Sequence, residues 1–149
     1  MTVLEKLDLE IKNAMKGRDE ARLSCVRMIK AAAKNKEIEL LHPLTEAEFF
    51  SLLANQAKQR RESIEQFARG GRHDLARKEE AELVVIQSFL PQSLSEGEVD
   101  RLIGEAILAV HAVGPKDMGA VMKHLKEKTA GRVDNKFLSD RVRAKLAPA

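Results

Sequence analysis

The chain has 149 residues, 44% of them hydrophobic and 33% charged, and its net charge is +3. This composition is too apolar for a disordered chain, and the length suffices for one large or two small hydrophobic cores. Apolar runs such as residues 83–86 and 106–110 are far shorter than the roughly 20 residues needed to cross a bilayer. We therefore expect a folded protein with no membrane-spanning segment.

Cysteine content and the N-terminal sequence bear on the cellular compartment. The single cysteine, Cys25, cannot form an internal disulfide, which agrees with a reducing compartment. Charged and apolar residues alternate from Leu4 to Lys12, so this segment lacks the continuous apolar stretch of a secretory signal. We therefore expect a mature chain that starts here and a cytoplasmic location.

Apolar residues recur at spacings of three and four along almost the whole chain, which predicts an all-α fold. Seven helices are expected, the first four at about residues 3–15, 19–40, 45–69 and 72–89. Thr45 and Ser95 are each followed three residues later by glutamate. This capping-box pattern predicts the starts of the third and fifth helices.

The segment 90–95 is the expected domain boundary, because Pro91 ends the fourth helix. Residues 1–90 are expected to form an N-terminal domain of long helices in a hairpin-like arrangement. Residues 91–149 are expected to form a small C-terminal domain of three short helices. No internal repeat and no low-complexity segment interrupts either part.

The second helix has a basic side. Between residues 12 and 36 the chain holds eight Lys or Arg against two acids. Placed at about 100° per residue, Arg27, Lys30 and Lys34 fall on one side of the helix. The opposite, apolar side is expected to contain Ala21, Cys25, Met28, Ile29, Ala32 and Ala33. The basic side is either a solvated helix face or a surface that follows phosphates.

The C-terminal segment is also basic, with nine Lys or Arg against four acids in residues 116–149. The chain has no Trp or Tyr, so RNA binding would use backbone and shape contacts rather than base stacking. The two basic regions together supply the candidate nucleic-acid-binding residues: Arg27, Lys30, Lys34, Lys123, Lys126, Lys128, Arg132, Lys136, Arg143 and Lys145.

Four residues around the sixth helix form a capping and packing motif. Asp117 and Asp134 are the expected N-caps of the last two helices, and Gly131 is the expected stop between them. Gly119 and Gly131 would also let another backbone come close. Phosphate capture at the helix N-terminus is the alternative, although the Asp117 carboxylate would compete with an anion there.

Charged residues interrupt the apolar stripes of the third and fourth helices. Arg60 lies ten residues before Gly70, while Glu79 and Glu82 lie eight and eleven residues after Gly71. If these glycines make a tight antiparallel hairpin, the three charges meet. We expect a partly buried structural network, because a guanidinium in an apolar stripe needs a partner. A catalytic or ligand site is the alternative.

No segment has the spacing of a known catalytic or cofactor motif. The phosphate loop, the dinucleotide-binding glycine pattern and the nucleophile elbow are absent, and the four histidines are scattered. We therefore expect no catalytic residue, no metal site and no cofactor.

Several segments in combination resemble the YqeY-like family, and the match covers essentially the whole chain. They are residues 14–16, 23–34 with RMIK at 27–30, 58–67, GRHDLA at 71–76, 79–82, FLP at 89–91, KDMGAVM at 116–122 and GRVD at 131–134. Residues from about 90 onward are also similar to the tail of the GatB component of the tRNA-dependent glutamyl/aspartyl amidotransferase.

The resemblance implies an all-helical fold with a long-helix N-terminal domain and a small C-terminal domain. It also implies a role near tRNA, since the amidotransferase tail approaches tRNA and similar domains are appended to some glutaminyl-tRNA synthetases. It does not supply a catalytic site, because ATP and metal chemistry in the amidotransferase belongs to a domain that is not matched here.

The leading hypothesis is therefore a non-catalytic tRNA-binding adaptor associated with tRNA-dependent amidation or aminoacylation. The alternative is an accessory component of a glutamine-dependent carbon–nitrogen ligase, which would contact an amidotransferase or an aminoacyl-tRNA synthetase through protein surfaces. An independent amidase-type enzyme is the third hypothesis.

Overall fold

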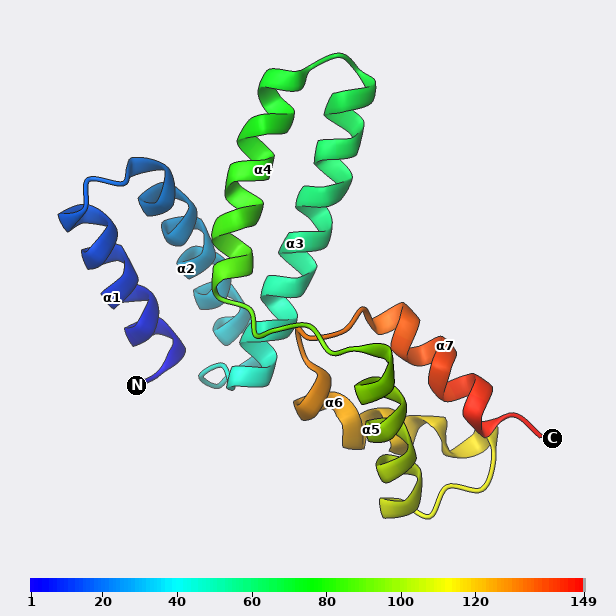
Figure 1. The fold of residues 1–149 in the computed structure, drawn as a ribbon. Helices are drawn as coiled ribbons and strands as arrows, with labels where there is room; N and C mark the ends of the chain where they lie inside the picture. The colour runs from blue at the N-terminus through cyan, green and yellow to red at the C-terminus, as the bar shows by residue number, and fades with distance from the viewer. Residues whose placement is uncertain (149) are drawn as a thin grey trace. The chain divides into compact units, whose positions relative to one another are not determined.

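The computed structural model describes residues 1–148, and within them the secondary structure is entirely helical (Figure 1). The predicted all-α fold is confirmed. The chain divides after Leu90 into two compact units, each with its own hydrophobic core. The helices are α1 (Val3–Lys16), α2 (Glu20–Leu40), α3 (Glu46–Arg69), α4 (His73–Ser88), α5 (Glu96–Ala109), η1 (Pro115–Asp117), α6 (Met118–Thr129) and α7 (Asn135–Leu146).

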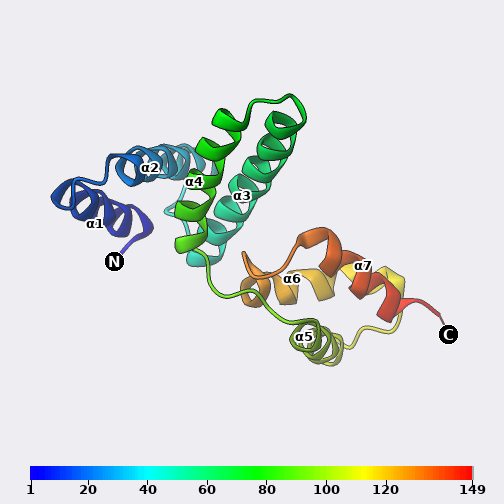
Figure 2. The same cartoon turned by 45° about the horizontal axis from the view of Figure 1, so that its top comes forward.

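The first unit consists of two antiparallel helical hairpins, α1–α2 and α3–α4 (Figures 1 and 2). Helix α2 joins them, because it packs against α1 on one side and against α4 and α3 on the other. The apolar side chains buried between these helices come from all four of them and from the α2–α3 connection. They are Val3, Leu7, Cys25, Val26, Ile29, Ala33, Leu44, Phe49, Leu53, Ala57 and Ile86.

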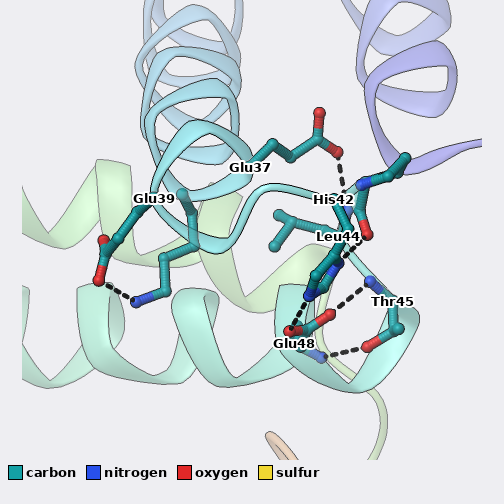
Figure 3. A network of polar contacts seen from close by, with 8 residues as sticks. Glu37, Glu39, His42, Leu44, Thr45 and Glu48 are labelled. Atoms are coloured by element: carbon teal, nitrogen blue, oxygen red, sulfur yellow. Dashed lines mark hydrogen bonds and ion pairs between the residues drawn. The ribbon is translucent and has the colours of Figure 1, made fainter.

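The α2–α3 connection is fixed by hydrogen bonds from both flanking helices (Figure 3). Thr45 and Glu48 cap α3 reciprocally: the Glu48 N–H donates to Thr45 Oγ1 at 3.1 Å, and the Thr45 N–H donates to Glu48 Oε1 at 2.9 Å. The N–H of buried Leu44 donates to Glu37 Oε2 of α2 at 2.8 Å. His42 Nε2 lies 3.5 Å from Glu48 Oε2. The connection therefore holds α3 at a set position on α2.

The buried face of α2 differs from the predicted one. Ala21 is exposed and Met28 is 45% exposed, although both were expected on the apolar side. The core instead contains Val26, which is fully buried and was missing from the predicted face. The reason is that α1 and α4 contact α2 from two directions, so its buried side is centred near Val26 and Ile29.

The second unit packs α5, α6 and α7 around a separate core. Ser95 and Glu98 form a capping box at the start of α5, and the Glu98 N–H donates to Ser95 Oγ at 3.2 Å. Donation from Ser95 to the carboxylate holds the pKa of Glu98 below its usual value. The core residues of this unit are Val99, Ile103, Ala106, Val121, Leu125, Leu138, Val142 and Leu146.

Arg132 attaches the start of the second unit to the α6–α7 turn. Its carbonyl accepts a hydrogen bond from the Leu94 N–H at 2.8 Å, and its Nε donates to the Gln92 carbonyl at 3.0 Å. The segment before α5 is thus fixed to the same unit as α5. Arg132 is therefore partly engaged in structure, although it was predicted as a nucleic-acid-binding residue.

The capping and packing motif is partly corrected by the structure. Asp134 caps α7 by accepting from the Phe137 N–H at 3.2 Å. Asp117 does not cap α6 with its side chain, because its carboxylate accepts from the N–H groups of Val113 and Gly114 in the preceding loop instead. Gly119 makes no close packing, since a Cβ there would meet nothing within 4 Å.

Gly131 has the turn role expected of it. The Arg132 N–H donates to the Thr129 carbonyl at 3.0 Å, and Gly131 takes a φ of 71° between them. With Ala130 at φ −56° and ψ 122°, this is a type II turn, which requires a left-handed residue at its third position. Glycine adopts that conformation without steric cost.

Gly70 and Gly71 offer a matched test of the α3–α4 turn. Gly71 has a φ of 73°, whereas Gly70 has a φ of −82°. A Cβ at Gly71 meets nothing within 4 Å, so Gly71→Ala should cost only the backbone strain, about 1 kcal/mol of unfolding free energy. Gly70→Ala should cost less than half of that value, because its Cβ makes ordinary van der Waals contacts. Urea unfolding followed by circular dichroism measures both, and equal losses would contradict the strain assigned to Gly71.

Candidate functional site

The predicted basic stripe on α2 is divided by an ion pair. The Lys30 ammonium pairs with the Asp8 carboxylate of α1 and is only partly exposed. Arg27 and Lys34 are exposed, and neither makes an ion pair with any residue of the described part of the chain. Two of the three predicted cations on α2 are therefore available to a partner molecule.

The lysines of α6 and α7 are exposed and unpaired within residues 1–148. Lys123 and Lys126 project about 60° apart on α6, while Lys128 lies about 160° from Lys126. On α7, Lys136 and Arg143 lie within about 20° of each other, and Lys145 lies about 160° away from Arg143. The predicted cations of the second unit therefore point in more than one direction on each of these helices.

Arginines of the second unit make ionic contacts that the lysines lack. Arg143 Nη1 donates to Asp140 Oδ1 at 3.2 Å on the exposed side of α7. Arg141 makes a bidentate ion pair with Asp100 of α5: its Nε donates to Oδ1 at 3.2 Å and its Nη2 donates to Oδ2 at 2.7 Å. The Arg141 guanidinium also lies 5.4 Å from the centre of the Phe137 ring. Sequence reasoning missed the Arg141–Asp100 pair, because nothing local relates two residues 41 positions apart.

Arg60, Glu79 and Glu82 meet between α3 and α4. Arg60 Nη1 donates to Glu79 Oε2 at 3.0 Å and lies 3.2 Å from Glu82 Oε2. The three side chains are 22%, 17% and 18% exposed. The contact between Arg60 and Glu82 is an ion pair without a hydrogen bond. The buried Oε2 of Glu82 has no hydrogen-bond partner within the described residues. One guanidinium is thus shared by two partly buried carboxylates, and the network holds α3 and α4 together.

Cys25 is a core residue rather than a nucleophile. Its side chain is 2% exposed, and its Sγ lies 3.7 Å from the Glu82 carbonyl, to which the thiol donates. Burial raises the pKa of the Cys25 thiol, and the Glu82 carboxylate raises it further, against smaller opposing effects of Arg60 and Arg22. A raised pKa lowers the thiolate fraction near neutral pH, so this thiol is poorly reactive.

The contacts of Arg22 were also missed by sequence reasoning. Its Nη2 lies 3.0 Å from Glu10 Oε2 of α1, and its Nη1 donates to Ser88 Oγ of α4 at 3.3 Å. The guanidinium also lies 5.3 Å from the centre of the Phe89 ring. Arg22 therefore links α1, α2 and the end of α4, and it contributes to packing rather than to a basic surface.

Neither a metal-binding cluster nor a membrane-spanning helix is found among the described residues. Within residues 1–148 no three His, Cys, Asp or Glu side chains group as they would around a metal ion. None of the helices in this range is both long and apolar enough to span a bilayer.

Comparison with known proteins gives a match over almost the whole chain. A family model described as "Yqey-like protein" matches residues 4–146. The protein named "Altered inheritance of mitochondria protein 41, mitochondrial" from Pyrenophora tritici-repentis is 31% identical over 94% of this chain and 78% of its own length. Proteins of the same name from Lachancea thermotolerans and Eremothecium gossypii are 31% and 32% identical, over 73% and 72% of this chain. The matches span 60% and 59% of those two proteins.

The names of these relatives correct one expectation from the sequence. All three proteins are described as mitochondrial. The predicted cytoplasmic location is therefore wrong. It was based on a single cysteine and on the absence of a secretory pattern, and a reduced cysteine is compatible with more than one compartment.

The Arg60 network can be tested by removing its centre. Arg60→Met leaves two carboxylates together without a cation, so it should lower the unfolding free energy by about 2 kcal/mol, less than for a fully buried pair. The triple variant Arg60→Met/Glu79→Gln/Glu82→Gln removes all three charges and should recover most of this loss. Urea unfolding followed by circular dichroism measures both. A triple variant as unstable as Arg60→Met would show that charge imbalance is not the cause.

The environment of Cys25 predicts slow alkylation. At pH 8 the native thiol should react with iodoacetamide about tenfold more slowly than an exposed thiol, because burial blocks access and the raised pKa reduces the thiolate. The matched control moves the thiol by one position to the exposed Ser24, in the variant Ser24→Cys/Cys25→Ala. Equal alkylation rates, measured by mass spectrometry, would contradict the burial of Cys25.

Proposed function

The chain belongs to the YqeY-like family, and from this premise we propose that it is a non-catalytic adaptor that binds tRNA. The observation that supports the proposal is the state of the lysines in the second unit. Lys123, Lys126 and Lys136 are exposed and have no ion-pair partner within the described residues. Phosphates of a folded RNA would supply the missing counter-charges.

The contrast between the lysines and arginines of this unit supports phosphate binding. Arg141 and Arg143 are engaged by Asp100 and Asp140, and Arg132 holds the segment before α5. The lysines, by contrast, are exposed to solvent and make no ion pair within residues 1–148. Flexible, unpaired ammonium groups suit contacts to phosphate without base readout, which is how a protein without Trp or Tyr would bind RNA.

Two groups that could have indicated an enzyme have structural roles instead. The Arg60 guanidinium pairs with the carboxylates of Glu79 and Glu82, and the Cys25 thiol is buried against the Glu82 carbonyl. The resemblance of residues 91–149 to the tail of the amidotransferase component GatB also supports a role beside tRNA. We therefore infer a carrier or positioning role in tRNA-dependent amidation or aminoacylation.

tRNA binding can be measured by titrating the full chain into fluorescently labelled bulk tRNA at 50–200 mM salt, with anisotropy as the readout. The affinity should fall steeply as salt rises. The variant Lys123→Gln/Lys126→Gln/Lys136→Gln should bind about tenfold more weakly, and its salt dependence should lose about three counterions. All tRNAs should be affected about equally, because phosphate contacts do not read sequence.

A control of equal charge change distinguishes a binding surface from net charge. Lys6, Lys58 and Lys78 of the first unit are exposed and make no ion pair within residues 1–148. Lys6→Gln/Lys58→Gln/Lys78→Gln should retain nearly the full affinity. Absent or salt-independent binding by the unmodified chain would overturn the proposal. Equal losses in the two triple variants would overturn the assignment to α6 and α7.

A further inference from the structure

Helix α2 has an uncharged face that no other helix of the first unit covers. Its exposed residues recur at alternating spacings of three and four, which is the a and d pattern of a two-helix contact. Met28 is 45% exposed and Ile38 is 72% exposed, so two large apolar side chains lie open to water on one helix. The stripe runs along α2 for about 26 Å and consists of Ala21, Ser24, Met28, Ala31, Asn35 and Ile38.

Two unpaired cations border this stripe on one side. Arg27 and Lys34 are seven residues apart, so they lie two turns apart in the same row of the helix. Lys30, one turn from each of them, is paired with Asp8 and turned toward α1. A surface that only follows phosphates needs no apolar stripe beside its cations. Met28 and Ile38 therefore indicate a protein partner here.

We propose that α2 binds an amphipathic acidic helix of another protein along this stripe. The small side chains Ala21, Ser24 and Ala31 leave room for large apolar residues of the partner, while Met28 and Ile38 contact the same apolar face. Carboxylates seven residues apart on the partner helix would pair with Arg27 and Lys34. This surface is separate from the proposed RNA-binding lysines, which belong to the other unit.

Charge argues against a second copy of the chain as the occupant. If two α2 helices paired antiparallel, Arg27 of one copy would approach Lys34 of the other, which is unfavourable. If they paired parallel, Arg27 would face Ala32, and only Lys34 would face a carboxylate, that of Glu39, which already pairs with Lys36 of its own helix. An acidic partner helix satisfies both cations in either direction, so it fits the surface better than the chain itself.

The probe for this surface is a labelled 21-residue helical peptide of about three heptads, with leucine at a and d and glutamate at e and g. Two further peptides serve as references: a scrambled version of the same composition, and a version with lysine in place of glutamate. Anisotropy titration with the full chain gives the affinities. The unmodified chain should bind the glutamate peptide about tenfold more tightly than either reference.

Two variants of the chain test the stripe and the cations beside it, and a third is the control. Ile38→Glu should weaken binding of the glutamate peptide about tenfold, and its tRNA affinity should stay unchanged, which separates this proposal from the proposed function. Arg27→Glu/Lys34→Glu should reverse the preference toward the lysine peptide. The control Lys58→Glu/Lys78→Glu makes the same charge change on α3 and α4 and should keep the original preference. Circular dichroism melts check that all variants fold.

Three results would overturn the proposal. One is equal binding of the scrambled and patterned peptides, which would mean that only net charge matters. Another is an unchanged affinity in Ile38→Glu. The third is sedimentation of the unmodified chain as a dimer that Ile38→Glu dissociates, because the occupant would then be a second copy.

Discussion

The packing of the first unit depends on the burial of one side of α2 between α1 and the α3–α4 hairpin. One face of this helix has to contact α1 and the α3–α4 hairpin together, and Val26, Ile29 and Ala33 are the side chains that fill the space between them. The polar contacts follow from this packing. Arg22 reaches Glu10 and Ser88 only because α1 and α4 lie on either side of α2, and Lys30 meets Asp8 for the same reason. The same packing leaves the opposite face of α2 uncovered.

Cations in this chain separate into two groups by their surroundings. Arginines with a partner on another helix, such as Arg22, Arg60 and Arg141, hold elements together at distances of 2.7 to 3.0 Å. This agrees with the flat guanidinium, which can bind two oxygens and stack on a ring at once. Exposed lysines such as Lys123 have no such partner within residues 1–148. Net charge alone would not reveal which cations are already paired, and the unpaired ones, Lys123 and its neighbours on α6 and α7 together with Arg27 and Lys34 on α2, are the groups that remain for an outside ligand.

Much of the fold could be predicted from local patterns. The three- and four-residue spacing of apolar residues predicted the helices. The glutamates that follow Thr45 and Ser95 predicted two helix starts, and the glycines at 70 and 71 predicted the turn between α3 and α4. The interval from Arg60 to those glycines also brought it opposite Glu79, because a hairpin converts sequence spacing into contact. Contacts between helices that do not form a hairpin escaped prediction, as Arg141 with Asp100 shows. Burial of Met28 was predicted wrongly, because a helical wheel shows which residues share a side of the helix but not which side the neighbouring helices contact. The RNA-binding role of the cations stays a prediction.

The hydrogen bonds of Arg132 bear on whether the second unit could occur in other proteins. Its two hydrogen bonds to residues 92 and 94 close the second unit at the point where the chain enters it. The core of α5, α6 and α7 therefore needs no side chain from the first ninety residues to exclude water. A segment that is self-contained at its entry can be joined behind a different protein without exposing an apolar face at the junction. Closure of this kind is what a domain requires if gene fusion is to distribute it among proteins that otherwise share nothing.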